Sequence, residues 1–513
     1  MSGPDLCRYS RQAGPLTRWR NRTSIKRIET LSDLLSSHRY DWNCRMTTTG
    51  MSGRTSVMRR KRMAALMVGF ALAVSPVAAH AQSGNPLNFL DNIFNSGQRQ
   101  AQAPSAPAPA TGASPPLPWT GEDGASGHPL MTAAAIREAA ANFDSCVAGL
   151  WPDAARRGIS EQNYRDITAG LTPDLRLMDL MDSQPEFTKA IWDYLDILVN
   201  DNRAAKGREV LAQYKTIFDA AERAYGVDRY IVASIWGIES NYSTMIGDRD
   251  VVRSTATLAC VGRRQPYFKD EFLTAVEILH RGDLRREQLK GSWAGAFGPT
   301  QFMPTAFKRF AVDGDGDGRR DVVDNPTDLI FSTANNLKKD GWQSGQPWGY
   351  EVVVPQGFNY MQADRAKMLT LAQWEQLGLK RANGQPFPRG GEKAYLLAPA
   401  GAQGPGFLMM QNFRVIMKYN PAEAYAMAIG HFADKLRGGP PFVQPWPRQE
   451  RVLSRAERLE LQQLLVQRGY YKGTPDGQFG SMTREALRNF QASIGAPADG
   501  FATSEILDRL RGR

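Results

Sequence analysis

Residues 227–242 read VDRYIVASIWGIESNY, and this stretch constrains the fold more than any other. Apolar residues cover so much of the segment that we expect a helix buried on most of its faces, with Glu239 at its end. Burial disfavours a charged carboxylate and favours the protonated form that a general acid needs. A solvated glutamate at the end of an ordinary helix is the alternative, and it is the commoner case.

The surrounding sequence predicts a mainly α-helical body over residues 129–445. Apolar residues recur at three- and four-residue spacing in four segments, at 133–150, 185–198, 208–225 and 230–239. Strand-like runs are few, and the candidates are 351–354 and 395–397. The expected fold class is therefore mainly α with minor β.

A proline- and glycine-rich break at 438–447 separates a small C-terminal unit, residues 452–511. Ser454 followed by Glu457 is a capping box, which opens a helix. Two later segments of the unit also place apolar residues on one helical face. We expect a compact module of three helices that carries no catalytic group.

Residues 290–304 read KGSWAGAFGPTQFMP, in which small residues lie among aromatic ones. This composition indicates either close approach of the backbone to a ligand or tight packing against a helix. Ser292 and Gln301 are the polar side chains able to orient a sugar. A glycine-rich packing turn without a ligand is an equal alternative.

Residues 313–324 read DGDGDGRRDVVD, with aspartates at loop positions 1, 3, 5, 9 and 12 and glycine at position 6. This is the EF-hand spacing, which gathers oxygen ligands around one Ca²⁺ and uses the backbone carbonyl of Arg319. The loop aspartates are Asp313, Asp315, Asp317, Asp321 and Asp324. Asp324 has a shorter arm than the usual glutamate, and Asp328 could replace it in a longer loop. The alternative, a solvated turn, must tolerate crowded negative charges.

Residues 412–425 supply Tyr419, Asn420 and Tyr425, which could line a groove. Alone they are weak signals, because such tyrosines are more often part of a core. Other chemistries lack their residues. The five histidines are scattered without an HExxH or CxxC pattern, so we expect no zinc site. No GxSxG elbow, Walker A loop or dinucleotide fingerprint is evident.

The first 81 residues contain fourteen Lys and Arg against four Asp and Glu, so they account for nearly all of the net charge of +11. Residues 58–81 have the layout of a secretory signal peptide, with a basic stretch, an apolar stretch and an Ala-His-Ala cleavage site. We therefore expect a periplasmic protein with no nucleic-acid partner and no stable membrane anchor. Residues 1–57 are interpreted as the product of a misassigned translation start or as an extension of unknown role. Residues 82–128, rich in Ala and Pro, are expected to be a disordered linker.

Cys146 and Cys260 are the cysteines that remain beyond the first 81 residues, where Cys7 and Cys44 lie. Two cysteines in an oxidising compartment usually pair, so we predict a disulfide between them. Two buried free thiols are the alternative.

Together these stretches resemble the lytic murein transglycosylase B family, whose catalytic domain is lysozyme-like. The resemblance covers about 130–440, with the motifs in the family's order. The motifs are QPEFT at 184–188, WDY at 192–194, ASIWGIES at 233–240, TLA at 257–259, the segment 291–304, the aspartate loop and the segment 412–425. Residues 452–511 resemble the peptidoglycan-binding module often appended to cell-wall enzymes.

The resemblance implies roles for individual residues. Glu239 matches the catalytic glutamate, and Ser292 and Gln301 match the residues that orient the glycan. The positions that match groove residues are Tyr194, Tyr267, Tyr419, Asn420 and Tyr425. The aspartate loop matches a structural calcium site whose final ligand aligns with Asp328 rather than Asp324. Two departures are Asn336, where some relatives have a groove tyrosine, and Ser243, where glycine is usual.

The resemblance also implies the reaction. The counterpart of Glu239 protonates the oxygen between N-acetylmuramic acid and N-acetylglucosamine, then accepts the proton of the muramic C6 hydroxyl as an anhydro end forms. No cofactor takes part, and we expect a monomer that acts on peptidoglycan glycan strands. A hydrolysing muramidase, which usually needs two carboxylates, stays as a rival hypothesis. A non-catalytic wall-binding scaffold is a second rival.

Overall fold

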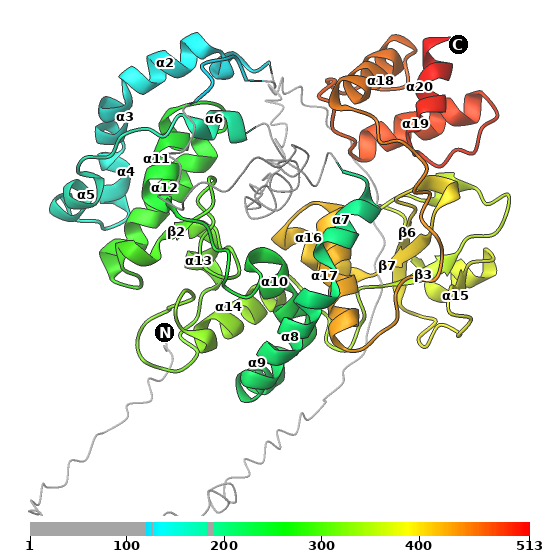
Figure 1. Ribbon diagram of the computed structural model, residues 1–513, viewed down its shortest axis with the longest axis horizontal. Coiled ribbons are helices and arrows are strands. Elements are labelled where there is room, and N and C mark those ends of the chain that lie inside the picture. Colours follow the sequence, from blue (N-terminus) through cyan, green and yellow to red (C-terminus); the bar gives the residue numbers. More distant parts are fainter. Residues whose placement is uncertain (1–118, 125–126, 182–188, 513) are drawn as a thin grey trace, which may run out of the picture. The chain divides into compact units, whose positions relative to one another are not determined.

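The computed structural model describes residues 119–124, 127–181 and 189–512 (Figure 1). The predicted extension at 1–57, the signal peptide at 58–81, most of the linker at 82–128 and the motif at 184–188 lie outside the described residues. Within the described ranges, no helix combines the length and apolar character needed to cross a membrane.

Short helices form the first lobe of the helical body. They are η2 (Pro129–Met131), α2 (Ala133–Ala141), α3 (Phe143–Gly149), α4 (Trp151–Arg156), α5 (Glu161–Thr168) and α6 (Arg176–Leu180). The expected single helix at 133–150 is two helices, α2 and α3, because the chain turns at Asn142. The Asn142 side chain donates a hydrogen bond of 3.0 Å to the carbonyl of Glu138, which terminates α2.

A disulfide joins this lobe to the helices that follow. Cys146 of α3 pairs with Cys260 at the end of α11 (Val251–Cys260). Helix α11 packs along α12 (Gln265–Arg281), and α12 in turn packs on α5. The two strands β1 (Arg249–Asp250) and β2 (Lys290–Gly291) pair antiparallel beside them.

The centre of the body is a group of helices that lie side by side in Figure 1. They are α7 (Ile191–Leu198), α8 (Asp201–Gln213), α10 (Arg229–Ser240) and α17 (Glu423–Leu436). The helix expected at 208–225 starts earlier, since the Asn200 side chain accepts a 2.9 Å hydrogen bond from the Arg203 amide and caps α8. The helix is then interrupted at Tyr214, after which α9 (Lys215–Tyr225) begins.

Three more helices complete the body, α13 (Pro304–Phe310), α14 (Pro326–Lys339) and α16 (Gln411–Tyr419). Helix α16 packs on α17, and α14 packs on α9 and α13. Single turns of 3-10 helix occur at η4 (Arg286–Gln288), η5 (Tyr360–Gln362) and η6 (Gly401–Gln403).

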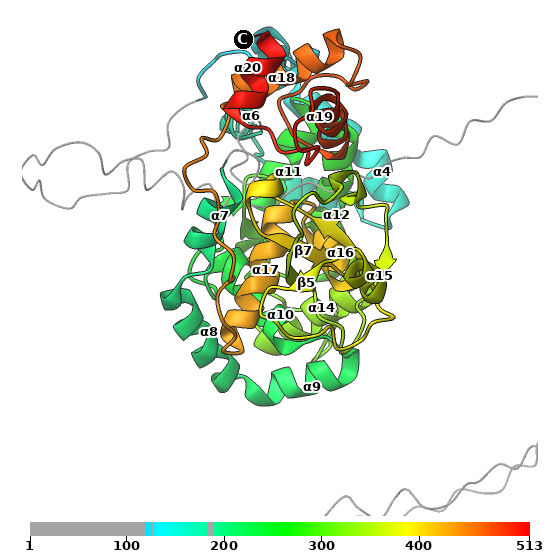
Figure 2. The ribbon, with the colours of Figure 1, turned by 90° about the vertical axis from the view of Figure 1, so that its right-hand side faces the viewer.

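An antiparallel sheet of five strands, in the order β4-β6-β7-β3-β5, lies beside α16 and α17 (Figure 2). The strands are β3 (Gly349–Val353), β4 (Leu369–Thr370), β5 (Lys380–Arg381), β6 (Lys393–Leu397) and β7 (Gly406–Met409), and α15 (Leu371–Gln376) follows β4. The two expected strands correspond to β3 and β6. Strand β7 was not predicted, because a short, fully buried apolar run has no alternation that separates it from a helix segment.

The C-terminal unit consists of α18 (Arg455–Gln467), α19 (Ser481–Ser493) and α20 (Ser504–Arg511). The predicted capping box is present, because the Ser454 hydroxyl accepts from the Glu457 amide at 3.2 Å and the Glu457 carboxylate accepts from the Ser454 amide at 2.8 Å. Leu461, Leu487 and Leu507 lie in a hydrophobic core separate from that of the helical body. The predicted fold class, mainly α with minor β and a three-helix C-terminal unit, is confirmed.

Candidate active site

Glu239 lies in the last turn of α10. The helix begins at Asp228, whose carboxylate accepts a 2.8 Å hydrogen bond from the amide of Tyr230. From Ile231 onward each residue of α10 is buried, and Glu239 itself has no exposed surface. Of the two interpretations of the sequence, the buried carboxyl is therefore the one that the structure contains.

The hydroxyl of Tyr425, on α17, donates a 2.6 Å hydrogen bond to Oε1 of Glu239. Burial raises the pKa of Tyr425 well above its usual value of 10, and the neighbouring Glu239 carboxylate raises it further. The phenol therefore stays protonated and acts as a hydrogen-bond donor, so Glu239 has a neutral rather than a charged partner here. Tyr194 of α7 is fully buried and close enough to add to the same pKa shift.

Tyr419 and Asn420 lie at the C-terminal end of α16. The Tyr419 hydroxyl donates to the backbone carbonyl of Thr300, which ties α16 to the loop before α13. Asn420 is fully buried and its Oδ1 accepts a 3.0 Å hydrogen bond from the Ala422 amide. Among the described residues its Nδ2 has no hydrogen-bond partner, so it remains a donor for a ligand oxygen.

Ser292 and Gln301 belong to the glycine-rich loop between β2 and α13. The Ser292 hydroxyl accepts a 3.1 Å hydrogen bond from the Ala296 amide, within a turn so tight that a Cβ on Gly291 would lie 1.9 Å from the Ala296 carbonyl oxygen. The Gln301 Nε2 donates to the carbonyls of Ile246 at 3.1 Å and of Gly298 at 2.9 Å. The loop is thus a tightly packed turn, as one interpretation of the sequence expected, and Gln301 also faces a cavity.

That cavity is a groove with a volume of about 640 Å³, and its lining residue Tyr419 is close enough to Glu239 for the two to interact electrostatically. Glu239, Asn420 and Tyr425 are not among the residues that line it. Three residues predicted to bind substrate line it, Tyr267, Gln301 and Tyr419. Asn336 of α14 lines it as well, at the position where some relatives have a groove tyrosine. The groove is open and walled by aromatic and polar side chains, which suits an extended polar ligand.

Glu271 is a second carboxyl in this groove, and the sequence reasoning missed it. It lies on α12, nearly fully buried, and its two oxygens accept hydrogen bonds from the amide and the hydroxyl of Thr305 at 2.9 and 2.7 Å. Burial raises the pKa of Glu271, and the Thr305 and Tyr267 hydrogen bonds oppose that rise. The carboxyl therefore holds the groove wall together. Glu271 and Glu277 are both buried in α12, and acidic residues among the apolar ones of 265–281 were the signal that could have revealed Glu271.

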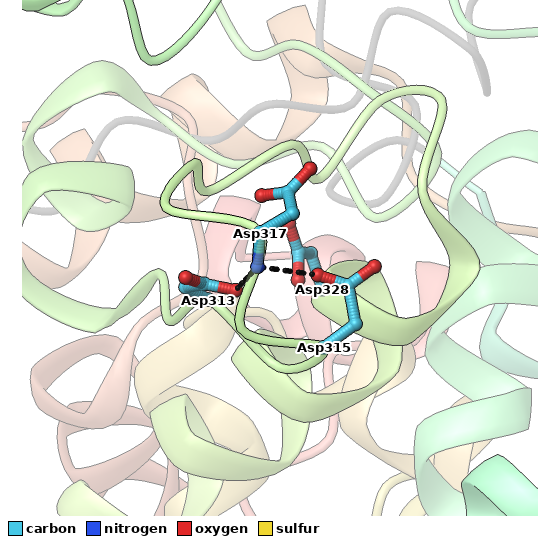
Figure 3. Close-up of side chains that lie close together, drawn as sticks. All are labelled: Asp313, Asp315, Asp317 and Asp328. Atoms are coloured by element: carbon cyan, nitrogen blue, oxygen red, sulfur yellow. Dashed lines mark hydrogen bonds between the residues drawn. The ribbon is translucent and has the colours of Figure 1, made fainter. Parts of the chain in front are cut away.

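The aspartate loop forms a second acidic site (Figure 3). Carboxylate oxygens of Asp313, Asp315, Asp317 and Asp328 all lie within 4.8 Å of one another. The Asp313 carboxylate accepts backbone hydrogen bonds from Gly316 at 2.6 Å and Gly318 at 2.8 Å, which shape the loop.

Asp321 and Asp324, the expected ligands at positions 9 and 12, are outside this cluster. The Gln288 amide donates to Asp321 at 2.8 Å and to Asp324 at 2.6 Å, which holds both carboxylates toward the helical body. Arg319 contributes its backbone amide to Asp317 at 2.8 Å.

Asp328, from the first turn of α14, closes the cluster. It is fully buried, and that burial raises its pKa, to which the charges of Asp315 and Asp313 add. A divalent cation would relieve this repulsion and supply the missing positive charge, so the donor set fits Ca²⁺.

A mainly helical body with a buried carboxyl and an open groove suits an enzyme that acts on an extended polar chain. Residues 142–434 match the model of the transglycosylase SLT domain family, and residues 454–510 match that of a peptidoglycan binding domain. The first match spans more than half of the chain, so the chain belongs to the SLT transglycosylase family. It is a lytic transglycosylase with a lysozyme-like catalytic domain.

Individual relatives agree with this family. The chain is 28% identical over 289 residues to membrane-bound lytic murein transglycosylase B of Escherichia coli (strain K12). The aligned region covers 53% of this chain and 77% of that protein. It is 44% identical to SltB3 of Pseudomonas aeruginosa, solved in complex with NAG-anhNAM-pentapeptide, with a TM-score of 0.69 over 72% of this chain and 99% of that one. The complex of SltB3 with NAG-NAM-pentapeptide gives a TM-score of 0.70.

Proposed function

We propose that Glu239 is the single acid and base with which this lytic transglycosylase cuts the bond between N-acetylmuramic acid and N-acetylglucosamine. The observation that carries the proposal is the buried Glu239 carboxyl, which accepts a hydrogen bond from the neutral hydroxyl of Tyr425 and lies close to Tyr419, a residue that lines the groove. The relative SltB3 was solved with peptidoglycan fragments, one of which contains anhNAM, and this supports the same substrate class here.

The reaction needs Glu239 in two protonation states. Protonated Glu239 donates its proton to the glycosidic oxygen as the bond from that oxygen to C1 of the muramic sugar breaks. The carboxylate left behind accepts the proton of the C6 hydroxyl as the C6 oxygen bonds to C1, which closes the 1,6-anhydro ring. Glu239 ends protonated again, and neither water nor a cofactor is consumed.

The residues around Glu239 have distinct tasks in this reaction. Tyr425 stabilises the carboxylate between the two proton transfers, because its hydroxyl is a donor to that charged form. The free Nδ2 of Asn420 is a donor for a substrate oxygen, and the groove wall of Tyr267, Gln301 and Tyr419 orients the glycan. Ser292 shapes the loop that presents Gln301.

A hydrolysing muramidase is the second candidate, since Glu271 places another carboxyl in the groove. Against that role, both oxygens of Glu271 already accept hydrogen bonds from Thr305. Digestion of isolated sacculi by the wild-type chain, Glu239→Gln and Glu271→Gln, followed by mass spectrometry, separates the two functions. We expect anhydro ends from the wild type and from Glu271→Gln, and no products from Glu239→Gln. Reducing muramic ends that depend on Glu271 would favour hydrolysis instead.

We also propose that Asp313, Asp315, Asp317 and Asp328 hold a structural Ca²⁺ that stabilises the loop before α14. Their mutual distances and the buried position of Asp328 support this ligand set. The ion has no part in the chemical step. Thermal unfolding with added Ca²⁺ and with a chelator tests this site.

The expected location is the periplasm, after removal of residues 58–81 as a signal peptide. The disulfide between Cys146 and Cys260 supports an oxidising compartment. Sequencing the N-terminus of the exported protein should give Gln82 as its first residue. A protein retained in the cytoplasm with its first 81 residues intact would overturn this part of the proposal.

A further inference from the structure

The residues that follow Glu239 have an unusual backbone. Asn241, Tyr242 and Ser243 all have positive φ, of 48°, 57° and 67°. This left-handed region is unfavourable for residues with a Cβ, and three such residues in a row persist only where the surroundings enforce them. The strain therefore begins two residues after the proposed catalytic carboxyl.

Several contacts fix this left-handed segment. The Trp236 indole donates to the Ser243 hydroxyl at 2.9 Å, and the Ser243 amide donates to the Ser240 hydroxyl at 2.9 Å. The Lys206 ammonium group, on α8, donates to the Asn241 carbonyl at 3.1 Å. The hydroxyl of Ser243, at a position where glycine is usual in the family, thus accepts a hydrogen bond from α10.

The side chain that the strained backbone directs inward is Tyr242, which is buried. Its ring fills a slot between α8, α10 and α17, helices that lie side by side in Figure 1. Two glycines make the slot possible. A Cβ on Gly207 of α8 would lie 2.1 Å from the Tyr242 hydroxyl oxygen, and a Cβ on Gly237 of α10 would lie 2.6 Å from its Cζ.

The same slot borders on α17, the helix that carries Tyr425. The built Cβ of Gly237 would also lie 2.9 Å from Phe432, and that of Gly207 would lie 2.6 Å from Leu436. The Tyr242 ring therefore packs where the end of α10 meets α17. These two helices supply the two atoms of the hydrogen bond between Glu239 and Tyr425.

We propose that Tyr242 is a positioning residue of the reaction: its ring, held in the slot of Gly207 and Gly237, fixes the end of α10 against α17 and so sets the Glu239–Tyr425 hydrogen bond. This inference rests on the proposed role of Glu239. The positioning comes from the packing of the ring and not from the hydroxyl, because the Tyr242 hydroxyl has no hydrogen-bond partner among the described residues.

The test compares Tyr242→Leu with Tyr242→Phe in the full chain. For Tyr242→Leu we expect kcat per folded enzyme to fall about 10- to 100-fold, as for a small displacement of a catalytic group, with KM near wild type and a shifted pH profile of kcat. Tyr242→Phe keeps the ring, so its kcat and its pH profile should match those of the wild type. Tyr164→Leu, which removes a buried tyrosine from α5, is the matched control, expected to lower stability but not to change kcat or the pH profile.

A second pair of variants keeps the tyrosine. Alanine forms helix better than glycine, so a loss of kcat in Gly207→Ala must come from the new Cβ, whose closest clash is with the Tyr242 hydroxyl oxygen at 2.1 Å, ahead of Leu436 at 2.6 Å. Adding Tyr242→Phe removes the closest clashing atom and should recover part of that loss. This pair tests the positioning role of Tyr242 even if Tyr242→Leu folds poorly.

Glu239→Gln in the same assay separates the two proposals. Wild-type kcat and pH profile in Tyr242→Leu, or in Gly207→Ala, would overturn the positioning role while an inactive Glu239→Gln keeps the proposed function. Activity in Glu239→Gln would overturn both. A loss of kcat in Tyr164→Leu equal to that of Tyr242→Leu would reduce Tyr242 to an ordinary core residue.

Discussion

Two acidic regions of the catalytic domain use carboxyl groups in opposite ways. At the end of α10 one carboxyl, Glu239, is fully buried and accepts a hydrogen bond from the hydroxyl of Tyr425. In the aspartate loop four carboxylates lie within 4.8 Å of one another, and Asp313, Asp315 and Asp317 are exposed. A single buried carboxyl with a neutral donor can lose and regain a proton without disturbing its surroundings.

The crowded carboxylates of the loop repel one another and are best stabilised by a divalent cation. The consequence is a division of labour between the regions. Glu239→Gln, at the end of α10, should alter the reaction and leave stability nearly unchanged. Changes in the aspartate loop should alter stability and leave the chemistry nearly unchanged.

The largest effect is expected for Glu239→Gln. Activity on sacculi should fall by about 10⁴-fold, because one group supplies both general-acid and general-base catalysis. The unfolding temperature, with and without Ca²⁺, should stay near that of the wild type, since glutamine keeps the shape and can accept the Tyr425 hydrogen bond. The activity assay and calorimetry check both statements. A Glu239→Gln variant that is inactive because it is unfolded would contradict the expected difference between the two regions.

Tyr425→Phe should have the next largest effect. Loss of a hydrogen bond to a charged group should lower kcat about 10- to 100-fold. The carboxylate of Glu239 loses a donor that favours its charged form, so the basic limb of the kcat profile should move to higher pH. The measurement is kcat as a function of pH.

Tyr419→Phe is the matched control for this prediction. Its hydroxyl donates to the Thr300 carbonyl rather than to Glu239, so the basic limb should stay in place. An equal displacement in both variants would mean that the Glu239–Tyr425 hydrogen bond has no special part.

Calcium binding tests the prediction that the aspartate loop controls stability. Saturating Ca²⁺, at about 100 times its Kd, should stabilise the wild type by about 2.7 kcal/mol, seen as a rise in unfolding temperature that a chelator reverses. Asp328→Asn should lose this rise, because Asp328 closes the cluster. Asp324→Asn should keep it, because Gln288 holds Asp324 outside the cluster. A calcium response lost in Asp324→Asn and kept in Asp328→Asn would reverse the ligand assignment.

The C-terminal unit should have the smallest effect on chemistry. Its core is separate from that of the helical body, so deletion of 452–511 should leave the catalytic domain folded. The domain should be less stable, because Phe501 packs against a buried cluster that contains Trp192 and Arg484 forms an ion pair with the buried Glu423. Binding to insoluble sacculi, measured by co-sedimentation, should weaken while turnover of soluble fragments stays unchanged. A large loss of turnover on soluble fragments would show that the unit takes part in the active site.

The two regions also differ in how far the sequence predicts them. The aspartate loop is local, and its spacing alone indicates a cation site. Even so, the spacing predicted Asp321 and Asp324 as ligands. Both carboxylates accept hydrogen bonds from Gln288, which lies 33 and 36 positions away and outside the loop, so the spacing could not reveal this contact. The structure brings Asp328 into the cluster instead, an option that the longer loop had left open.

Glu239 was flagged by its apolar helix, but its partner could not be derived. Tyr425 is 186 positions away, and only the packing of α10 on α17 brings the two together. Glu271 was missed for the same reason, because its role depends on Thr305 in another helix. Patterns within one helix predict burial, whereas hydrogen bonds between helices require the fold.

The most direct test of the central claim is digestion of sacculi in water enriched in ¹⁸O, with mass spectrometry of the muramic ends. If Glu239 alone serves as acid and base and the C6 oxygen is the nucleophile, the new ends are anhydro sugars without ¹⁸O. Ends that contain one ¹⁸O atom for each bond cut would show that water attacks C1, and would contradict the account.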